Sequence, residues 1–128
     1  MPIQTKILIT PEQYLKIERA AATKSEYFHG EMFALAGSSR EHNEISGNIL
    51  SSFHSQIPND RCKVYMSDIR VKVPPTSLYT YPDVIVACSP AFEDEHADTM
   101  LNPALIVEVL SESTEAYDRA KCLLTTAS

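Results

Sequence analysis

Two apolar stretches decide the fold: residues 81–88 read YPDVIVAC and residues 104–110 read ALIVEVL. Continuous apolar runs of this length are typical of central strands in a sheet that is covered on both faces. Each stretch also carries one acid, Asp83 just before the first apolar run and Glu108 near the end of the second. The sequence therefore predicts two core strands with an acid at one end of each.

The acid in the second stretch has aliphatic neighbours on both sides. A buried carboxylate must be protonated, ion-paired or bound to a metal, because leaving it charged and alone is costly. If the two strands are antiparallel neighbours, Asp83 and Glu108 face each other across one rung, and a hard divalent cation such as Mg²⁺ would relieve their repulsion. A strand-end glutamate that reaches solvent or an arginine is the alternative.

The rest of the chain predicts helices and strands around these two runs. A capping box at Thr10 and Gln13 begins a helix that runs to about residue 22 and buries Tyr14, Ile17 and Ala21. A hairpin follows over residues 26–35, with its turn at His29-Gly30. A second capping box, Ser38 with Glu41, begins a helix to about residue 57, whose inward stripe comprises His42, Ile45, Ile49 and Phe53.

Residues 62–73 alternate as one strand with a bend at Ser67-Asp68, residues 93–98 form an acidic solvated loop, and a last helix follows Ser111. This order predicts an α/β fold, a mixed central sheet flanked by helices. We expect residues 1–128 to form a single domain with no strand after the last helix.

Composition narrows the function classes. The chain has no apolar run long enough to span a membrane and no secretory signal at its start, so we expect a cytoplasmic protein. Its three cysteines, Cys62, Cys88 and Cys122, are far apart in apolar or strand-like stretches and are expected to be buried reduced thiols. The net charge of −6 disfavours nucleic-acid binding, because phosphates are bound mainly by lysine and arginine.

Several motifs together resemble the Uma-type family of endonucleases, a branch of the PD-(D/E)XK nuclease superfamily. They are residues 26–31 (EYFHGE) with Gly37 and His42, then YPDVIV at 81–86 and PALIVEVLS at 103–111, and finally Ser113, Thr114, Asp118 and Lys121. The resemblance spans about Thr10 to Lys121. It implies a restriction-endonuclease-like fold and hydrolysis of DNA phosphodiesters with Mg²⁺ or Mn²⁺, with Asp83 and Glu108 as the metal ligands.

The chain departs from the superfamily motif at its third residue, because Leu110 stands where the motif has a lysine. Lys121 could replace that cation by reaching back from the last helix, although a solvated lysine paired with Asp118 is equally consistent with the sequence. His42 could be a metal ligand or general base, or a hydrogen-bonded core histidine.

Weaker candidates are Glu26, Glu31 and Asp68 as further carboxylates, and Arg70 and Lys72 as cations for a nucleic-acid backbone. A solvated hairpin face is a better explanation for Glu26 and Glu31 than a role in the site. A solvated strand face explains Arg70 and Lys72 as well as contact with nucleic acid does.

Two functional hypotheses follow. The first is a metal-dependent endonuclease with Asp83, Glu108, Lys121 and His42 at its site. The second is an inactive module of the same fold that binds nucleic acid or a protein partner, which the acidic charge and the missing motif lysine favour. Members of the family continue into further strands, so we expect a truncated domain whose open sheet edge is covered by a second copy in a homodimer.

Overall fold

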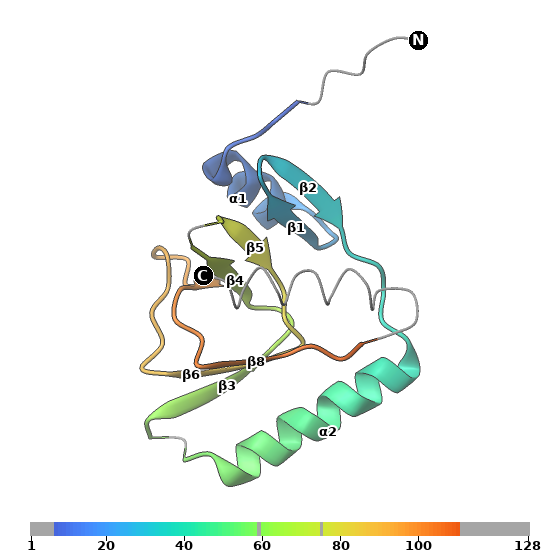
Figure 1. Ribbon diagram of the computed structural model, residues 1–128, viewed down its shortest axis with the longest axis vertical. Helices are drawn as coiled ribbons and strands as arrows, with labels where there is room; N and C mark the ends of the chain where they lie inside the picture. The colour runs from blue at the N-terminus through green and yellow to red at the C-terminus, as the bar shows by residue number, and fades with distance from the viewer. Residues whose placement is uncertain (1–6, 59, 75, 111–128) are drawn as a thin grey trace.

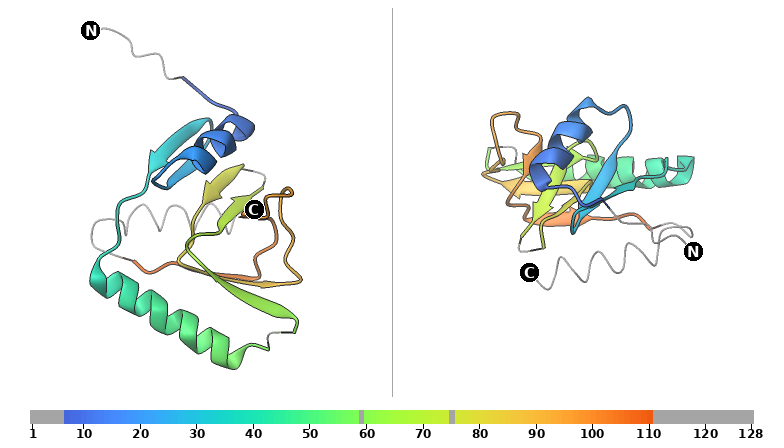
Figure 2. Two further views of the ribbon diagram at one scale, coloured as in Figure 1. Left: turned by 180° about the vertical axis from the view of Figure 1, so that it is seen from behind. Right: turned by 90° about the horizontal axis from the view of Figure 1, so that it is seen from above.

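The computed structural model describes residues 7–58, 60–74 and 76–110, and these form an α/β fold with helices at both ends of the molecule (Figures 1 and 2). The strands form a five-stranded sheet, ordered β2-β1-β5-β4-β7, and a three-stranded sheet, ordered β3-β6-β8. All pairs are antiparallel except β4–β7, so the predicted mixed α/β class is confirmed. The elements are α1 (Pro11–Ala20), β1 (Ser25–Phe28), β2 (Glu31–Ala34), α2 (Arg40–Gln56), β3 (Cys62–Met66), β4 (Arg70–Val73), β5 (Leu78–Thr80), β6 (Val84–Cys88), β7 (Thr99–Met100) and β8 (Leu105–Val107).

The first helix begins as the sequence predicts. Thr10 Oγ1 accepts from Gln13 N at 3.1 Å, and Gln13 Oε1 accepts from Thr10 N at 2.8 Å, which completes the capping box. Tyr14 is fully buried, but Ile17 is 47 % exposed and the helix ends at Ala20. The inward face is therefore Tyr14, Leu15 and Glu18, rotated from the predicted one.

The predicted hairpin is confirmed. β1 and β2 pair antiparallel up to Phe28 and Glu31, and His29 and Gly30 make the turn with φ of +49° and +84°. Gly30 suits this turn for two reasons. Its backbone lies in the region that favours glycine, and a Cβ there would lie 3.0 Å from Leu8.

The predicted strand 62–73 is two strands in different sheets. β3 and β4 are separated at Ser67-Asp68, where the sequence predicted a bend. The bend carries the chain from the three-stranded sheet to the five-stranded one. β5 and β7 were missed, because three and two residues are too few to show alternation.

The two apolar stretches that decide the fold do form neighbouring strands. β6 lies between β3 and β8, and its residues Val84, Ile85, Val86 and Ala87 are buried. β8 is different, because in the described ranges it pairs only with β6, and its Leu105 is 46 % exposed. The prediction of a second strand covered on both faces is therefore wrong for this part of the chain.

The second helix, α2, packs against β3 and β6 without burying a residue of its own. Its N-cap is Ser39, which accepts from His42 N at 3.1 Å, so the predicted cap at Ser38 is one residue early. Ile45 is 48 % exposed, which contradicts the predicted inward stripe.

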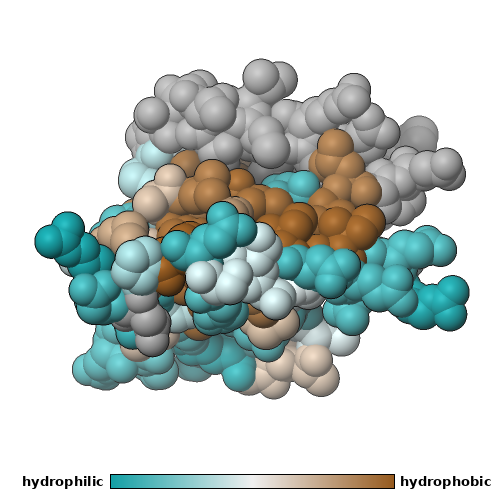
Figure 3. Space-filling view, turned by 90° about the horizontal axis from the view of Figure 1, so that it is seen from below, coloured by the Kyte–Doolittle hydropathy of each residue, from teal (hydrophilic) through white to brown (hydrophobic). Residues whose placement is uncertain are grey.

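A band of apolar residues crosses the face of the molecule seen from below (Figure 3).

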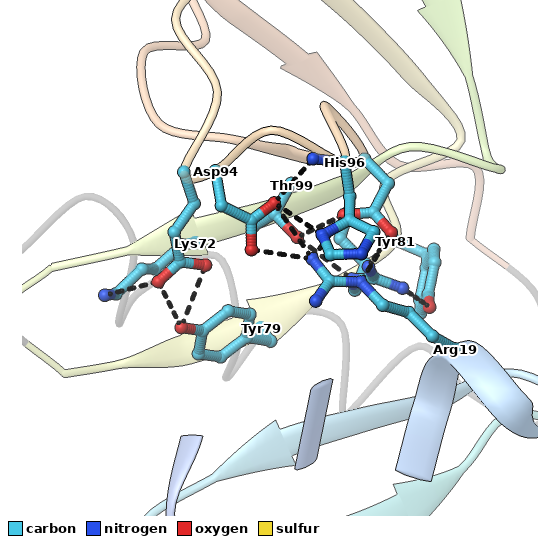
Figure 4. Close-up of polar contacts among 10 residues, drawn as sticks. Arg19, Lys72, Tyr79, Tyr81, Asp94, His96 and Thr99 are labelled. Carbon is cyan, nitrogen blue, oxygen red and sulfur yellow. Dashed lines mark hydrogen bonds and ion pairs between the residues drawn. The ribbon is translucent and has the colours of Figure 1, made fainter. Parts of the chain in front are cut away.

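The acidic loop 93–98 is ion-paired and not merely solvated. Arg19 of α1 bonds both Asp94 and Asp98, and Arg70 of β4 lies 2.6 Å from Asp98 (Figure 4). Arg70 is only 5 % exposed, with bonds to Thr99 and Tyr81. The prediction that Arg70 lies on a solvated or nucleic-acid-facing surface is therefore wrong.

Lys72 belongs to the same network. Its Nζ lies 3.1 Å from Glu93 Oε1, and Glu93 also accepts from the hydroxyl of the buried Tyr79 (Figure 4). Burial and the Glu93 carboxylate raise the pKa of Tyr79 above its ordinary value, so this hydroxyl remains a donor at neutral pH. Lys72 thus holds the loop against β4 and β5.

Two of the three cysteines are joined. Cys62 of β3 lies opposite Cys88 of β6, and the two form a disulfide. The prediction of reduced thiols is wrong for this pair, because antiparallel register brings together residues that are 26 positions apart in the chain. Cys122 lies outside the described residues.

The buried arginine provides a test of this packing. We expect Arg70→Ala to lower the free energy of unfolding by about 2–3 kcal/mol, because it leaves buried polar partners without their cation. Urea denaturation followed by circular dichroism measures the change. Arg40→Ala is the control: Arg40 is 86 % exposed and 3.9 Å from Glu44, so its loss should cost less than about 0.5 kcal/mol. Equal losses in the two variants would contradict the assignment.

The acidic loop also predicts a pH dependence. The hydrogen bond from Arg19 holds the pKa of Asp98 well below its ordinary value, with Arg70 adding to the effect. A depressed carboxyl pKa stabilises the folded state above the unfolded pKa of about 4, and this stability is lost as the pH falls below that value. We expect Asp98→Asn to reduce the difference in unfolding free energy between pH 7 and pH 2.5. An unchanged difference would show that Asp98 has no such role.

Candidate functional site

Asp83 lies where three parts of the chain meet. It directly precedes β6, and its Oδ2 accepts from the backbone N–H of Val109 at 2.7 Å. The same oxygen lies 3.1 Å from Nε2 of His42 on α2. The side chains of Asp83 and His42 are 15 % and 17 % exposed. One carboxylate oxygen therefore joins the start of β6, the segment after β8 and the first turn of α2.

The register of the three-stranded sheet brings the second acid to the same edge. β6 and β8 pair antiparallel, with Val84 opposite Val107. The pairing ends at Val84 and Val107, so Asp83 directly precedes β6 and Glu108 directly follows β8 at the same edge of the sheet. The antiparallel arrangement expected from the sequence is thus present.

Glu108 is less enclosed than the sequence suggested. It follows the last residue of β8 and is partly buried, with the exposed Leu110 two positions further on. Glu108 therefore lies at a sheet edge and is not enclosed in the core. Leu110, at the position of the superfamily lysine, is 45 % exposed.

His42 occupies a position different from the one that its predicted stripe implied. It lies in the first turn of α2, and Ser46 and Leu50 follow it at intervals of four residues on one face of the helix. This row faces Asp83, whereas Ile45 is exposed. The histidine therefore hydrogen-bonds a carboxylate and is not a core residue within an apolar stripe.

The arrangement limits which cation the site could hold. Within residues 7–58, 60–74 and 76–110, no group of three or more His, Cys, Asp or Glu side chains is placed to bind a metal. Mg²⁺ does fit, because it binds one or two carboxylates and retains several waters. Asp83 and Glu108 supply two carboxylates.

The other candidate acids have different surroundings. Glu26 is 1 % exposed and accepts from the hydroxyl of Thr80, so the expectation of a solvated hairpin face is wrong for it. Asp68 is 82 % exposed and pairs with Lys24 at 2.6 Å. Glu31 is partly buried in β2. Lys121 lies outside the described residues.

Sequence reasoning missed the residues that surround the His42–Asp83 pair. A cavity of about 190 Å³ opens beside the pair, between α2 and the end of β3. The helical spacing of His42, Ser46 and Leu50 could have indicated this face. The residues from β3 and the following bend could not have been found without the tertiary fold. The missed residues are Ser38, Asn43, Ser46, Gly47, Leu50, Met66 and Ser67.

Residues 11–124 match the model of the Uma2 family, whose description reads "Putative restriction endonuclease". The chain belongs to the Uma2 family. This confirms the resemblance found in the sequence and covers all the described elements from α1 to β8.

The chain is similar to two uncharacterized proteins from Synechocystis sp. (strain PCC 6803). It is 39 % identical to slr1290 over 111 residues, which cover 87 % of this chain and 58 % of that protein. It is 34 % identical to sll1609 over 120 residues, which cover 93 % of this chain and 68 % of that protein. The chain therefore spans less than two thirds of the first of these relatives.

A solved structure from Anabaena variabilis, described as "a putative nuclease belonging to DUF820", has a similar fold. The TM-score is 0.72 at 22 % identity, and the match covers 91 % of this chain and 66 % of that one. This likeness confirms the predicted nuclease-like fold.

The contact between Asp83 and Val109 provides a test that needs no activity. Asp83→Ala removes the acceptor of a partly buried backbone N–H, so we expect it to lower the unfolding free energy by about 1–3 kcal/mol. Asp83→Asn keeps a carbonyl oxygen as acceptor and should lose less. Urea denaturation of both variants measures the difference. Two variants as stable as the unmodified protein would contradict the contact.

Proposed function

We propose that this protein is a metal-dependent endonuclease that hydrolyses DNA phosphodiester bonds. The observation that supports the proposal is the shared sheet edge: Asp83 directly precedes β6, Glu108 directly follows the antiparallel β8, and Asp83 bonds His42 and Val109 N. Membership of the Uma2 family supports the same reaction class. Two acids from different strands, a histidine and an adjoining cavity form an arrangement suited to binding a phosphate through a cation.

Asp83 and Glu108 would hold the cation, which is Mg²⁺ or Mn²⁺. The two described polar contacts of Asp83 both go to Oδ2, and Oδ1 is proposed as the oxygen that binds the cation. When bound, the metal would neutralise charge on the scissile phosphate and lower the pKa of a bound water. The two carboxylates would fix its position.

His42 is proposed as the residue that positions Asp83. Its Nε2 lies 3.1 Å from Asp83 Oδ2, so a proton on Nε2 holds the carboxylate in one orientation. The position of His42 in the first turn of α2 places the positive end of the helix dipole nearby, which favours an anion such as a phosphate. Lys121 is proposed to supply the positive charge that the motif lysine supplies in the superfamily.

The inactive module is the second candidate. Leu110 in place of the motif lysine favours it, as does the net charge of −6. Such a module would bind nucleic acid or a protein partner without cleaving it. A homodimer is also still a prediction.

We further propose that the protein acts in the cytoplasm, where cellular DNA is accessible. No helix in the described ranges is both long and apolar enough to cross a membrane. The Cys62–Cys88 disulfide is unusual for such a location, because disulfides are rare in the reducing cytoplasm.

Substitution of the two acids tests the proposed reaction. Asp83→Asn and Glu108→Gln should each abolish Mg²⁺-dependent cleavage of plasmid DNA, because each removes a charged ligand of the cation. Agarose gel electrophoresis follows nicking, and circular dichroism confirms that the variants fold. Glu95→Gln, in the exposed part of the acidic loop, is the matched control and should cleave normally.

Two outcomes would contradict the proposal. The first is an unmodified protein that cleaves neither DNA nor RNA with Mg²⁺ or Mn²⁺, which would leave the inactive module. The second is undiminished cleavage by both acid variants.

A further inference from the structure

The cavity beside the candidate metal site has walls of mixed chemistry. One wall is a single face of α2, formed by His42, Asn43, Ser46, Gly47 and Leu50. The opposite wall is formed by the end of β3 and the start of β6, with Met66, Ser67 and Asp83. The cavity therefore shares the His42–Asp83 pair with the proposed active site and extends away from it along the helix.

The charges of the lining do not suit a phosphate. No lysine or arginine is among the described residues that line the cavity, and Asp83 contributes a negative charge. An anion placed deep in the cavity would be repelled by this carboxylate and would find no paired cation in the lining. A neutral ligand fits better.

Two residues of α2 describe this wall of the cavity. Ser46 Oγ is shielded from solvent and has no hydrogen-bond partner within the described residues. At Gly47, an added Cβ would meet nothing within 4 Å. Gly47 is exposed, so this space is open to solvent beside the cavity.

We infer that this cavity binds the base of an unpaired nucleotide next to the scissile phosphate, an inference that rests on the proposed nuclease function. The volume of about 190 Å³ is suited to one base and is smaller than a typical pocket for a drug-sized ligand. Leu50 and Met66 supply apolar and sulfur contacts for the faces of an aromatic ring. The side-chain amide of Asn43 supplies a donor and an acceptor for its polar edge.

This assignment has a consequence for the substrate. A base can enter a side cavity only when it leaves the helical stack, which costs least where the strand is single or the base unpaired. The protein should therefore prefer single-stranded DNA, or duplexes with an unpaired base, to fully paired duplexes. Binding through a neutral base also reduces the dependence on basic residues in a chain with a net charge of −6.

Binding of small probes tests the cavity without catalysis. Thymidine and deoxyadenosine, which carry no phosphate, are titrated into ¹⁵N-labelled full-length protein and followed by NMR. We expect saturable shifts of the Asn43, Ser46 and Gly47 amide signals. Deoxyribose 5-phosphate, which carries no base, should leave these signals unchanged. Larger shifts with the sugar phosphate than with the nucleosides, or no shift with either, would overturn the inference.

A pair of variants locates the binding to the cavity. Gly47→Leu fills the open space on α2 and should weaken nucleoside binding by about tenfold or more, the factor expected for loss of one base contact. Asn48→Leu adds the same side chain to an exposed position of the same helix, outside the lining, and should bind like the unmodified protein. Equal affinities in the two variants would overturn the inference.

Cleavage assays then separate this inference from the proposed function. The unmodified protein should cleave a single-stranded oligonucleotide faster than the same sequence in a duplex, and Gly47→Leu should remove the difference. Faster cleavage of the duplex would overturn the base-binding inference while supporting the nuclease function. An absence of cleavage together with nucleoside binding at Ser46 and Gly47 would overturn the nuclease function and leave the cavity as a base-binding site.

Discussion

The site is organised by the carboxylate of Asp83. Its Oδ2 is held by Val109 N at 2.7 Å and by His42 Nε2 at 3.1 Å, so it links β6, the segment after β8 and α2. A carboxylate that is largely withdrawn from solvent is stable only with such donors or a cation. The bond to Val109 N also ties Asp83 to the segment that carries Glu108. The cavity beside the pair is a further result of placing α2 across this sheet edge.

A buried polar network next to the five-stranded sheet helps to position Asp83. Arg70, Tyr81 and Glu18 form a buried polar chain, in which Tyr81 donates to Glu18 at 2.6 Å. Burial and the bond to Glu18 raise the pKa of Tyr81 to about 12, so it remains a hydrogen-bond donor at neutral pH. Because Tyr81 and Pro82 lead directly into Asp83, the position of the candidate ligand depends on this interior network.

The sequence predicted those parts of the fold that depend on local signals. The capping box at Thr10, the His29-Gly30 turn and the bend near Ser67 each follow from the residues present. The pairing of β6 with β8 followed from two apolar runs of strand length. The family resemblance, carried by motifs across the chain, gave the nuclease-like fold.

Tertiary pairing explains what the sequence could not predict. Arg70 alternates with apolar residues like a solvated strand cation, but it is buried because Asp98 and Tyr81 lie across from it in the fold. Cys62 and Cys88 have no local relation, and only strand register brings them together. The cavity beside Asp83 depends on how α2 packs against β3 and β6, which no helical pattern encodes.

The most direct measurement of the central claim is a crystal structure of the full chain grown with Mn²⁺, analysed by anomalous scattering at the manganese edge. The account predicts one ordered ion bound by the carboxylates of both Asp83 and Glu108, with waters completing its coordination. No ion at this edge, with each acid satisfied by its own protein cation instead, would contradict the account.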